Sequence, residues 1–234
     1  MESRRLVRRI YSEKSIEKID KKIRLLGSNG KINTFDFLNL RLIIEILLFA
    51  FLLLFHSKGY FLAPILVVLF HFVFEYFFLD VPIKKREKKL EEEAIFFFEV
   101  LLLTLQSGKN LASALHLASK NIHSELSLEF EKSLREMKLG KSFSEALVGL
   151  KDRIPSDTIN NAILNIVQAS VFGNNIEESL SNQLDFLRDK RLLDIKSAIG
   201  KLPTKISIIS VIFFIPLILL VILGPVLVEF IMRT

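Results

Sequence analysis

The chain has 234 residues, of which half are hydrophobic and a quarter are charged, and its net charge is +6. Its mean hydropathy of +0.40 is high for so charged a chain, because apolar and charged residues occupy different segments. This segregation excludes a simple soluble globule, a disordered tail and a fibrous repeat.

Residues 1–37 form a basic segment that lacks the apolar core of a signal peptide, so a cleaved leader is not expected. Within it, apolar residues recur at helical spacing: Ile16, Ile19, Ile23 and Leu26. The pattern predicts an amphipathic helix that lies against the membrane or against other helices of the chain. Asn29-Gly30 predicts a turn after this helix.

The apolar stretch of residues 38–80 is interrupted only at His56-Ser57-Lys58-Gly59-Tyr60. Two membrane-spanning helices of about 18 residues each, joined there by a tight turn, explain the pattern. One long re-entrant element is the alternative.

Four ionisable residues fall within this hairpin: Arg41, Glu45, His71 and Glu75. Arg41 and Glu45 are four residues apart on the first helix, as are His71 and Glu75 on the second, so each pair shares a face. The two pairs lie at similar depth in the inner leaflet. Because such groups are costly in lipid, we expect a polar clasp between the two helices. A proton or ion pathway and snorkelling to the interface are the alternatives.

Residues 83–205 show apolar residues at three- and four-residue spacing and almost no strand signature. This predicts a bundle of six helices, at about 84–106, 110–121, 124–138, 142–151, 156–171 and 175–199. A solenoid of helical repeats is the alternative. The acidic run Glu91-Glu92-Glu93 is predicted to lie on the solvated face of the first helix.

Three similar segments mark corners between these helices. Each starts with a glycine that can end a helix in the left-handed conformation: Gly108, Gly140 and Gly173. Two residues later comes a side chain that can cap the next helix: Asn110, Ser142 and Asn175. In the second and third segments a glutamate completes a capping-box pattern: Glu145 and Glu178. These are predicted structural motifs rather than contact sites.

Residues 206–231 contain no charged residue between Ile206 and Val228. This length crosses the hydrocarbon core of a bilayer as a helix. Pro216 and Pro225 lie inside it, as membrane helices allow.

The distribution of basic residues predicts the orientation. They are abundant before residue 41 and directly after the second span, at Lys84, Lys85, Arg86, Lys88 and Lys89. Positive flanks stay in the cytoplasm, so the N-terminus and residues 83–205 are expected inside, and the C-terminus outside. The expected fold is an all-α, multi-pass protein of the plasma (inner) membrane, with three transmembrane helices and a cytoplasmic six-helix bundle between the second and third.

No catalytic, cofactor-binding or metal-binding residues are predicted, and we do not expect an enzyme. Without cysteine there is no thiolate site, and neither His116 nor His123 has a carboxylate at metal-ligand spacing. No phosphate loop or nucleophile elbow occurs. Acidic residues alternate with Arg188, Lys190 and Arg191, which favours lipid or partner contact over nucleic acid there.

The corner Leu105-Gln106-Ser107-Gly108-Lys109-Asn110-Leu111-Ala112-Ser113-Ala114-Leu115, the later glycine segments and the final span together resemble the type II secretion system F family. Residues 188–205, followed by Phe214-Ile215-Pro216 and Leu223-Gly224-Pro225, resemble the family's tight-adherence (Tad) pilus branch more closely. The resemblance covers residues 84–231 well and the hairpin only in layout.

The resemblance implies an inner-membrane platform protein of a type IV-like pilus or secretion machine, without catalytic residues. It implies as partners a hexameric cytoplasmic secretion ATPase, a related platform protein and pilin subunits, in a homo- or hetero-oligomer. The alternative function is a membrane transporter or ion-coupled subunit that uses Arg41, Glu45, His71 and Glu75.

Overall fold

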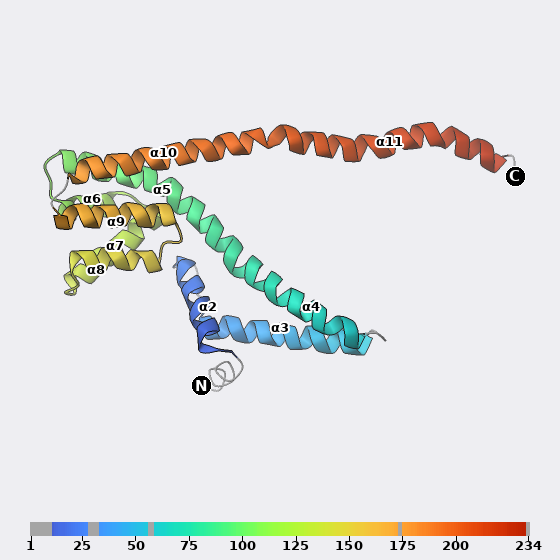
Figure 1. Cartoon of the computed structure of the whole chain (residues 1–234), viewed down its shortest axis with the longest axis horizontal. Helices are drawn as coiled ribbons and strands as arrows, with labels where there is room; N and C mark the ends of the chain where they lie inside the picture. Colours follow the sequence, from blue (N-terminus) through green and yellow to red (C-terminus); the bar gives the residue numbers. More distant parts are fainter. Residues whose placement is uncertain (1–10, 28–32, 56–58, 173–174, 233–234) are drawn as a thin grey trace. The chain divides into compact units, whose positions relative to one another are not determined.

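The computed structural model describes residues 11–27, 33–55, 59–172 and 175–232, and throughout these residues the regular structure is helical (Figure 1). The predicted turns at Asn29-Gly30 and at His56-Ser57-Lys58, and the glycine Gly173, lie outside the described residues. The chain divides into two units, Met1–Leu187 and Arg188–Thr234.

The first unit begins with α2 (Glu13–Leu25) and the hairpin of α3 (Thr34–Phe55) and α4 (Gly59–Glu75). α2 is the predicted amphipathic helix, and its buried face packs on the hairpin. These helices and the turn that follows α4 share a small core of Ile19, Ile23, Phe37, Leu38, Phe74 and Leu79. The Thr34 hydroxyl also donates a 2.7 Å hydrogen bond to Asp20, which joins the start of α3 to α2.

The second helix of the hairpin, α4, continues without a break into the next helix of the chain. α4 continues through the π-helical turn η2 (Tyr76–Asp80) into α5 (Val81–Gln106), so the expected start near residue 84 is absorbed into a longer helix. Pro82 lies in the first turn of α5. A proline clashes with the carbonyl four residues before it in an α-helix, and the wider π turn before Pro82 relieves that crowding.

Five further helices follow: α6 (Leu111–Asn121), α7 (Glu125–Lys138), α8 (Phe143–Val148), α9 (Asp157–Phe172) and α10 (Ile176–Gly200). Their bounds lie close to the predicted ones, except that α8 is short and passes into a 3₁₀ turn, η3 (Gly149–Asp152). Together with α5 these helices share one hydrophobic core. At its centre Phe97 of α5 stacks on Phe130 of α7, with ring centroids 4.5 Å apart.

The second unit contains the end of α10 and α11 (Leu202–Met232). α11 continues through Pro216 and Pro225, which agrees with the tolerance of membrane helices for proline. Among the described residues, three helical segments are long and apolar enough to cross a membrane: Thr34–Leu54, Ala63–Gln106 and Ile176–Pro225.

Candidate functional site

The predicted helix corners are built by side-chain caps. Asn110 accepts a 2.9 Å hydrogen bond from the Ser113 N–H at the start of α6. At α8, Ser142 accepts from the Glu145 N–H at 3.2 Å, and Glu145 accepts from the Ser142 N–H at 3.0 Å. These two bonds form a complete capping box.

At α10, Asn175 accepts a 3.3 Å hydrogen bond from the Glu178 N–H. This bond is one of the two that form the capping box predicted at the third corner.

Two of the corner glycines have the left-handed backbone, with φ of +83° at Gly108 and +103° at Gly140. At the second corner the Gly140 N–H bonds to the Met137 carbonyl and the Lys141 N–H to the Glu136 carbonyl. This pair of bonds is the Schellman ending of a helix.

Replacing Ser142 by alanine is expected to lower the free energy of unfolding by about 1 kcal/mol. The cap satisfies an N–H that has no partner within the six-residue helix α8. Ser144→Ala, two residues further on and inside α8, is the matched control and is expected to leave stability unchanged or slightly higher. Thermal and denaturant unfolding of the full chain in detergent measure both variants, and equal losses would contradict the capping role.

The four predicted intramembrane residues come together between α3 and α4. The Nδ1 of His71 lies 2.9 Å from Oε1 of Glu45. Arg41 is only 1% exposed and lies 3.8 Å from Glu45 and 3.7 Å from Glu75, beyond hydrogen-bonding distance. Its guanidinium carbon also lies 5.1 Å from the centroid of the Tyr11 ring, a cation–π distance.

Two residues that the sequence reasoning did not select complete this group. Lys22 of α2 lies 2.8 Å from Glu75 and 2.7 Å from Asp80. Glu75 directly precedes the π turn and Asp80 is its last residue, so the i→i+5 geometry brings both toward one side. Burial alone would lower the pKa of Lys22, but its hydrogen bonds to Asp80 and Glu75 raise it above the ordinary value.

We call these six residues the hairpin cluster: Lys22, Arg41, Glu45, His71, Glu75 and Asp80. Opposite charges alternate through it, and α2 contributes one of its cations. The ion pairs therefore compensate the charges inside an apolar hairpin and attach α2 to that hairpin.

A second charge network surrounds Arg86 of α5. Its guanidinium donates to the carboxylates of Glu125 and Glu129 of α7, and to the Arg153 carbonyl. It also donates a 2.7 Å hydrogen bond to the Leu25 carbonyl at the end of α2. Arg86 belongs to the basic flank from which the sequence predicts the orientation, and its side chain is only 6% exposed. The four hydrogen bonds satisfy its guanidinium inside the protein.

The network extends through Arg153. This side chain lies 3.1 Å from Glu129 and 2.9 Å from Glu136. It therefore joins the segment after η3 to α7. We call Arg86, Glu125, Glu129, Glu136 and Arg153 the Arg86 network.

Gly27 allows α2 to approach this network. Its φ is +70°, and a Cβ at this position would come within 2.7 Å of three guanidinium atoms of Arg86. Only glycine fits both the left-handed conformation and the close approach.

The prediction that Glu91-Glu92-Glu93 forms a solvated face is wrong for two of its three residues. Glu93 accepts a 2.9 Å hydrogen bond from the Leu126 N–H, in the first turn of α7. Glu91 accepts a 2.6 Å hydrogen bond from Ser156, whose hydroxyl caps α9. The carboxylates satisfy polar groups at the starts of neighbouring helices, which the spacing within α5 alone does not reveal.

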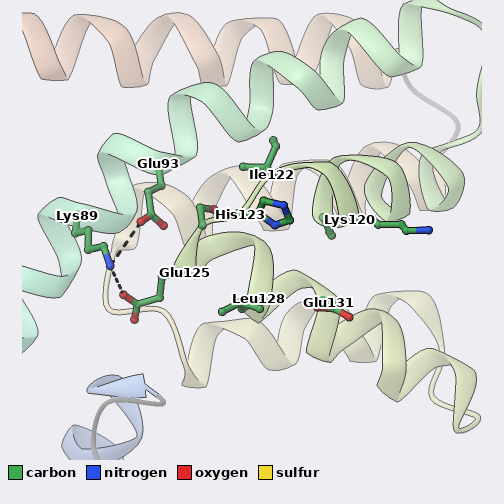
Figure 2. A pocket seen from close by; sticks show the side chains of 10 residues that line it. Lys89, Glu93, Lys120, Ile122, His123, Glu125, Leu128 and Glu131 are labelled. Carbon is green, nitrogen blue, oxygen red and sulfur yellow. Dashed lines mark hydrogen bonds and ion pairs between the residues drawn. The ribbon is translucent and has the colours of Figure 1, made fainter.

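An open pocket lies beside the network, between α5 and the segment that joins α6 to α7 (Figure 2). Figure 2 shows Lys89 between Glu93 and Glu125, at 3.8 Å and 3.0 Å. His123 also lines this pocket. Among the described residues, no group of three histidine or acidic side chains is placed to hold a metal ion.

Comparison with known families identifies the part of the chain that carries the corners. Residues 97–224 match the family described as type II secretion system (T2SS), protein F, and this segment is more than half of the chain. The chain belongs to this family. Neither the curated proteins nor the solved structures include a match to it.

The protein F match includes the corners at Asn110 and Ser142, and every member of the Arg86 network except Arg86. Arg86 itself and the hairpin cluster precede the matched segment. The three apolar helices and the family together fit a multi-pass inner-membrane protein.

The stability of this protein F domain is expected to fall at acidic pH. Burial opposes ionisation of Glu125, but hydrogen bonds from Arg86 and Lys89 outweigh it and lower its pKa below 4.5. The hydrogen bond from Lys141, with Arg153 nearby, lowers the pKa of Glu136 in the same direction. Because the folded state binds fewer protons than the unfolded state, this stability is complete above pH 4.5 and is lost as the pH falls through the folded pKa values.

Unfolding titrations of the full chain in detergent between pH 7 and pH 3 check this expectation. Glu136→Gln is expected to reduce the slope on the acid side, since glutamine does not titrate. A rise in stability below pH 4.5 would contradict the assignment.

Proposed function

We propose that the protein is an inner-membrane platform of a type IV-like pilus or type II secretion machine, which couples a cytoplasmic secretion ATPase to pilin assembly. The observation that carries the proposal is the protein F match over residues 97–224, on a chain with three helices able to span a membrane. Within the family we favour the Tad pilus branch. This choice rests on the sequence of the last span and of the basic segment that precedes it.

The proposed role requires a part that receives force from the ATPase and a rigid path to the membrane. The core of α5 to α10 supports the first requirement, because it is closely packed around Phe97 and Phe130. The unbroken helical run of residues 59–106 supports the second, since it joins that core to the hairpin without a loop. The hairpin cluster and the Arg86 network attach α2 to the middle of this path, at Glu75 and at Arg86.

In this proposal the six helices α5 to α10 form a cytoplasmic bundle, the N-terminus is inside and the C-terminus is outside. A topology reporter carries two enzymes, one active only in the cytoplasm and one active only outside it. Fused after Thr234, it is expected to show the outside activity. The same reporter inserted at Leu139, which is exposed at a helix corner, is expected to report the cytoplasm. A cytoplasmic signal from the C-terminal fusion would overturn this topology.

The function is tested in the native cell. Deletion of the gene is expected to abolish surface pili or secretion of the substrate, while pilin precursor remains in the inner membrane. Expression of the intact chain is expected to restore assembly. Normal pili and normal secretion in the deletion strain would contradict the proposal.

The alternative function, an ion-coupled transporter, receives no specific support. Every member of the hairpin cluster lies within 4 Å of an oppositely charged or hydrogen-bonding partner in the same cluster. This pairing favours a structural clasp over an ion pathway.

A further inference from the structure

α10 changes its environment partway along its length. Its first half buries Leu180, Leu184 and Leu187 in the core of the protein F domain. From Arg188 the chain belongs to the second unit, and the rest of α10 is exposed or nearly so. The buried residues of α10 therefore all lie in its first half.

This second half carries an apolar stripe of its own. Leu192, Ile195, Ile199 and Leu202 follow one another at intervals of three, four and three residues, and each is between 42% and 59% exposed. Leu192 is five residues beyond Leu187, which turns it by about 140° around the helix axis. The stripe therefore faces a different direction from the buried face of the first half.

Basic residues surround the stripe. Residues 188–205 contain six lysines and arginines and two acidic residues. Arg191 and Lys196 lie on the two sides of the stripe, and Lys201 lies on the opposite face of the helix. Long basic side chains beside an apolar stripe can cover it with their stems and reach phosphate groups with their charged ends.

A boundary between two helices lies at the end of the stripe. α10 ends at Gly200, and α11 begins at Leu202 with Pro203 in its first turn. Proline has no N–H, so the Ile199 carbonyl receives no helical bond from this position, and a helix bends most easily there. Beyond this boundary, α11 is the apolar helix that can cross a membrane, so the stripe adjoins the bilayer along the chain.

We propose that residues 188–202 form an interfacial helix that binds the anionic phospholipid surface next to the third span. The apolar stripe enters the boundary between headgroups and acyl chains, and the basic residues bind the lipid phosphates. A second copy of the chain is a poorer occupant of the stripe. In a parallel pair of such helices, Arg191 of one copy would face Lys196 of the other, and these charges repel.

The test uses the full chain in nanodiscs. Because the natural chain has no cysteine, single variants Ile199→Cys and Ser197→Cys accept one environment-sensitive fluorophore each. Ile199 lies in the stripe and Ser197 on the opposite face, two residues away. The discs contain phosphatidylcholine alone or mixed with phosphatidylglycerol, with or without spin-labelled lipid that quenches the fluorophore.

In anionic discs, quenching at position 199 is expected to exceed quenching at position 197 about threefold. The excess is expected to fall by about half in phosphatidylcholine alone and in the Arg191→Gln/Lys196→Gln variant, which removes the charges on the two sides of the stripe. Equal quenching at both positions would overturn the proposal. So would a blue-shifted but unquenched fluorophore at position 199, because it would show that protein covers the stripe. These outcomes do not depend on ATPase binding.

Discussion

Replacing Arg86 by alanine is expected to lower the free energy of unfolding by about 3 to 5 kcal/mol. The side chain donates to two carboxylates and two backbone carbonyls, from α2, α7 and the segment after η3. Its removal leaves Glu129, whose side chain is 2% exposed, with less compensation for its buried charge. It also frees the end of α2 from the protein F domain.

Denaturant unfolding of the full chain in detergent measures this loss. Arg135→Ala is the matched control, because Arg135 also pairs with a glutamate of α7, at 3.7 Å, but is 59% exposed. Its removal is expected to cost less than about 1 kcal/mol. If both variants lose similar stability, Arg86 does not hold the network as described. Limited proteolysis near Gly27 is expected to accelerate in Arg86→Ala alone.

Replacing Arg41 by methionine is expected to be the second most damaging change, also by about 3 to 5 kcal/mol. Methionine keeps much of the volume but removes the cation that lies near Glu45 and Glu75. Their charges would then remain in an apolar hairpin with only His71 and Lys22 beside them. Unfolding titrations in detergent measure the loss, and Arg24→Ala, an exposed ion pair on α2, is the control.

A second variant separates a clasp from an ion pathway. Adding Glu45→Gln and Glu75→Gln to Arg41→Met removes the uncompensated charges and is expected to recover a large part of the lost stability. Pilus assembly is expected to recover with it. Recovery of stability without any recovery of function would favour the transporter over the platform. Continued instability would show that the cluster is not a charge-balanced clasp.

Local features of the fold were predictable from the sequence because each depends on residues close together in the chain. The caps at Asn110 and Ser142 require only a side chain and an N–H three residues away. The hairpin cluster was partly predictable for the same reason, because Arg41–Glu45 and His71–Glu75 each share a helix face. Lys22 was missed because it reaches Glu75 across 53 residues.

The Arg86 network could not be predicted from spacing. Its partners come from three separate parts of the chain, and a basic flank of a membrane span normally remains solvated. Two signals in the sequence were available but weak. Gly27 directly follows the amphipathic helix, and Glu125 and Glu129 are spaced to share a face of α7. The prediction that Glu91 and Glu93 lie on a solvated face was wrong for the same reason, because their partners lie elsewhere in the chain.

We propose that this protein F domain couples a secretion ATPase to the membrane. The most direct measurement is binding of the secretion ATPase of the same cell to the full chain in nanodiscs, without nucleotide, with ADP and with a non-hydrolysable ATP analogue. We expect saturable binding whose affinity differs between nucleotide states, and no binding to empty discs. Absence of binding in all three states, with a correctly folded chain, would contradict it.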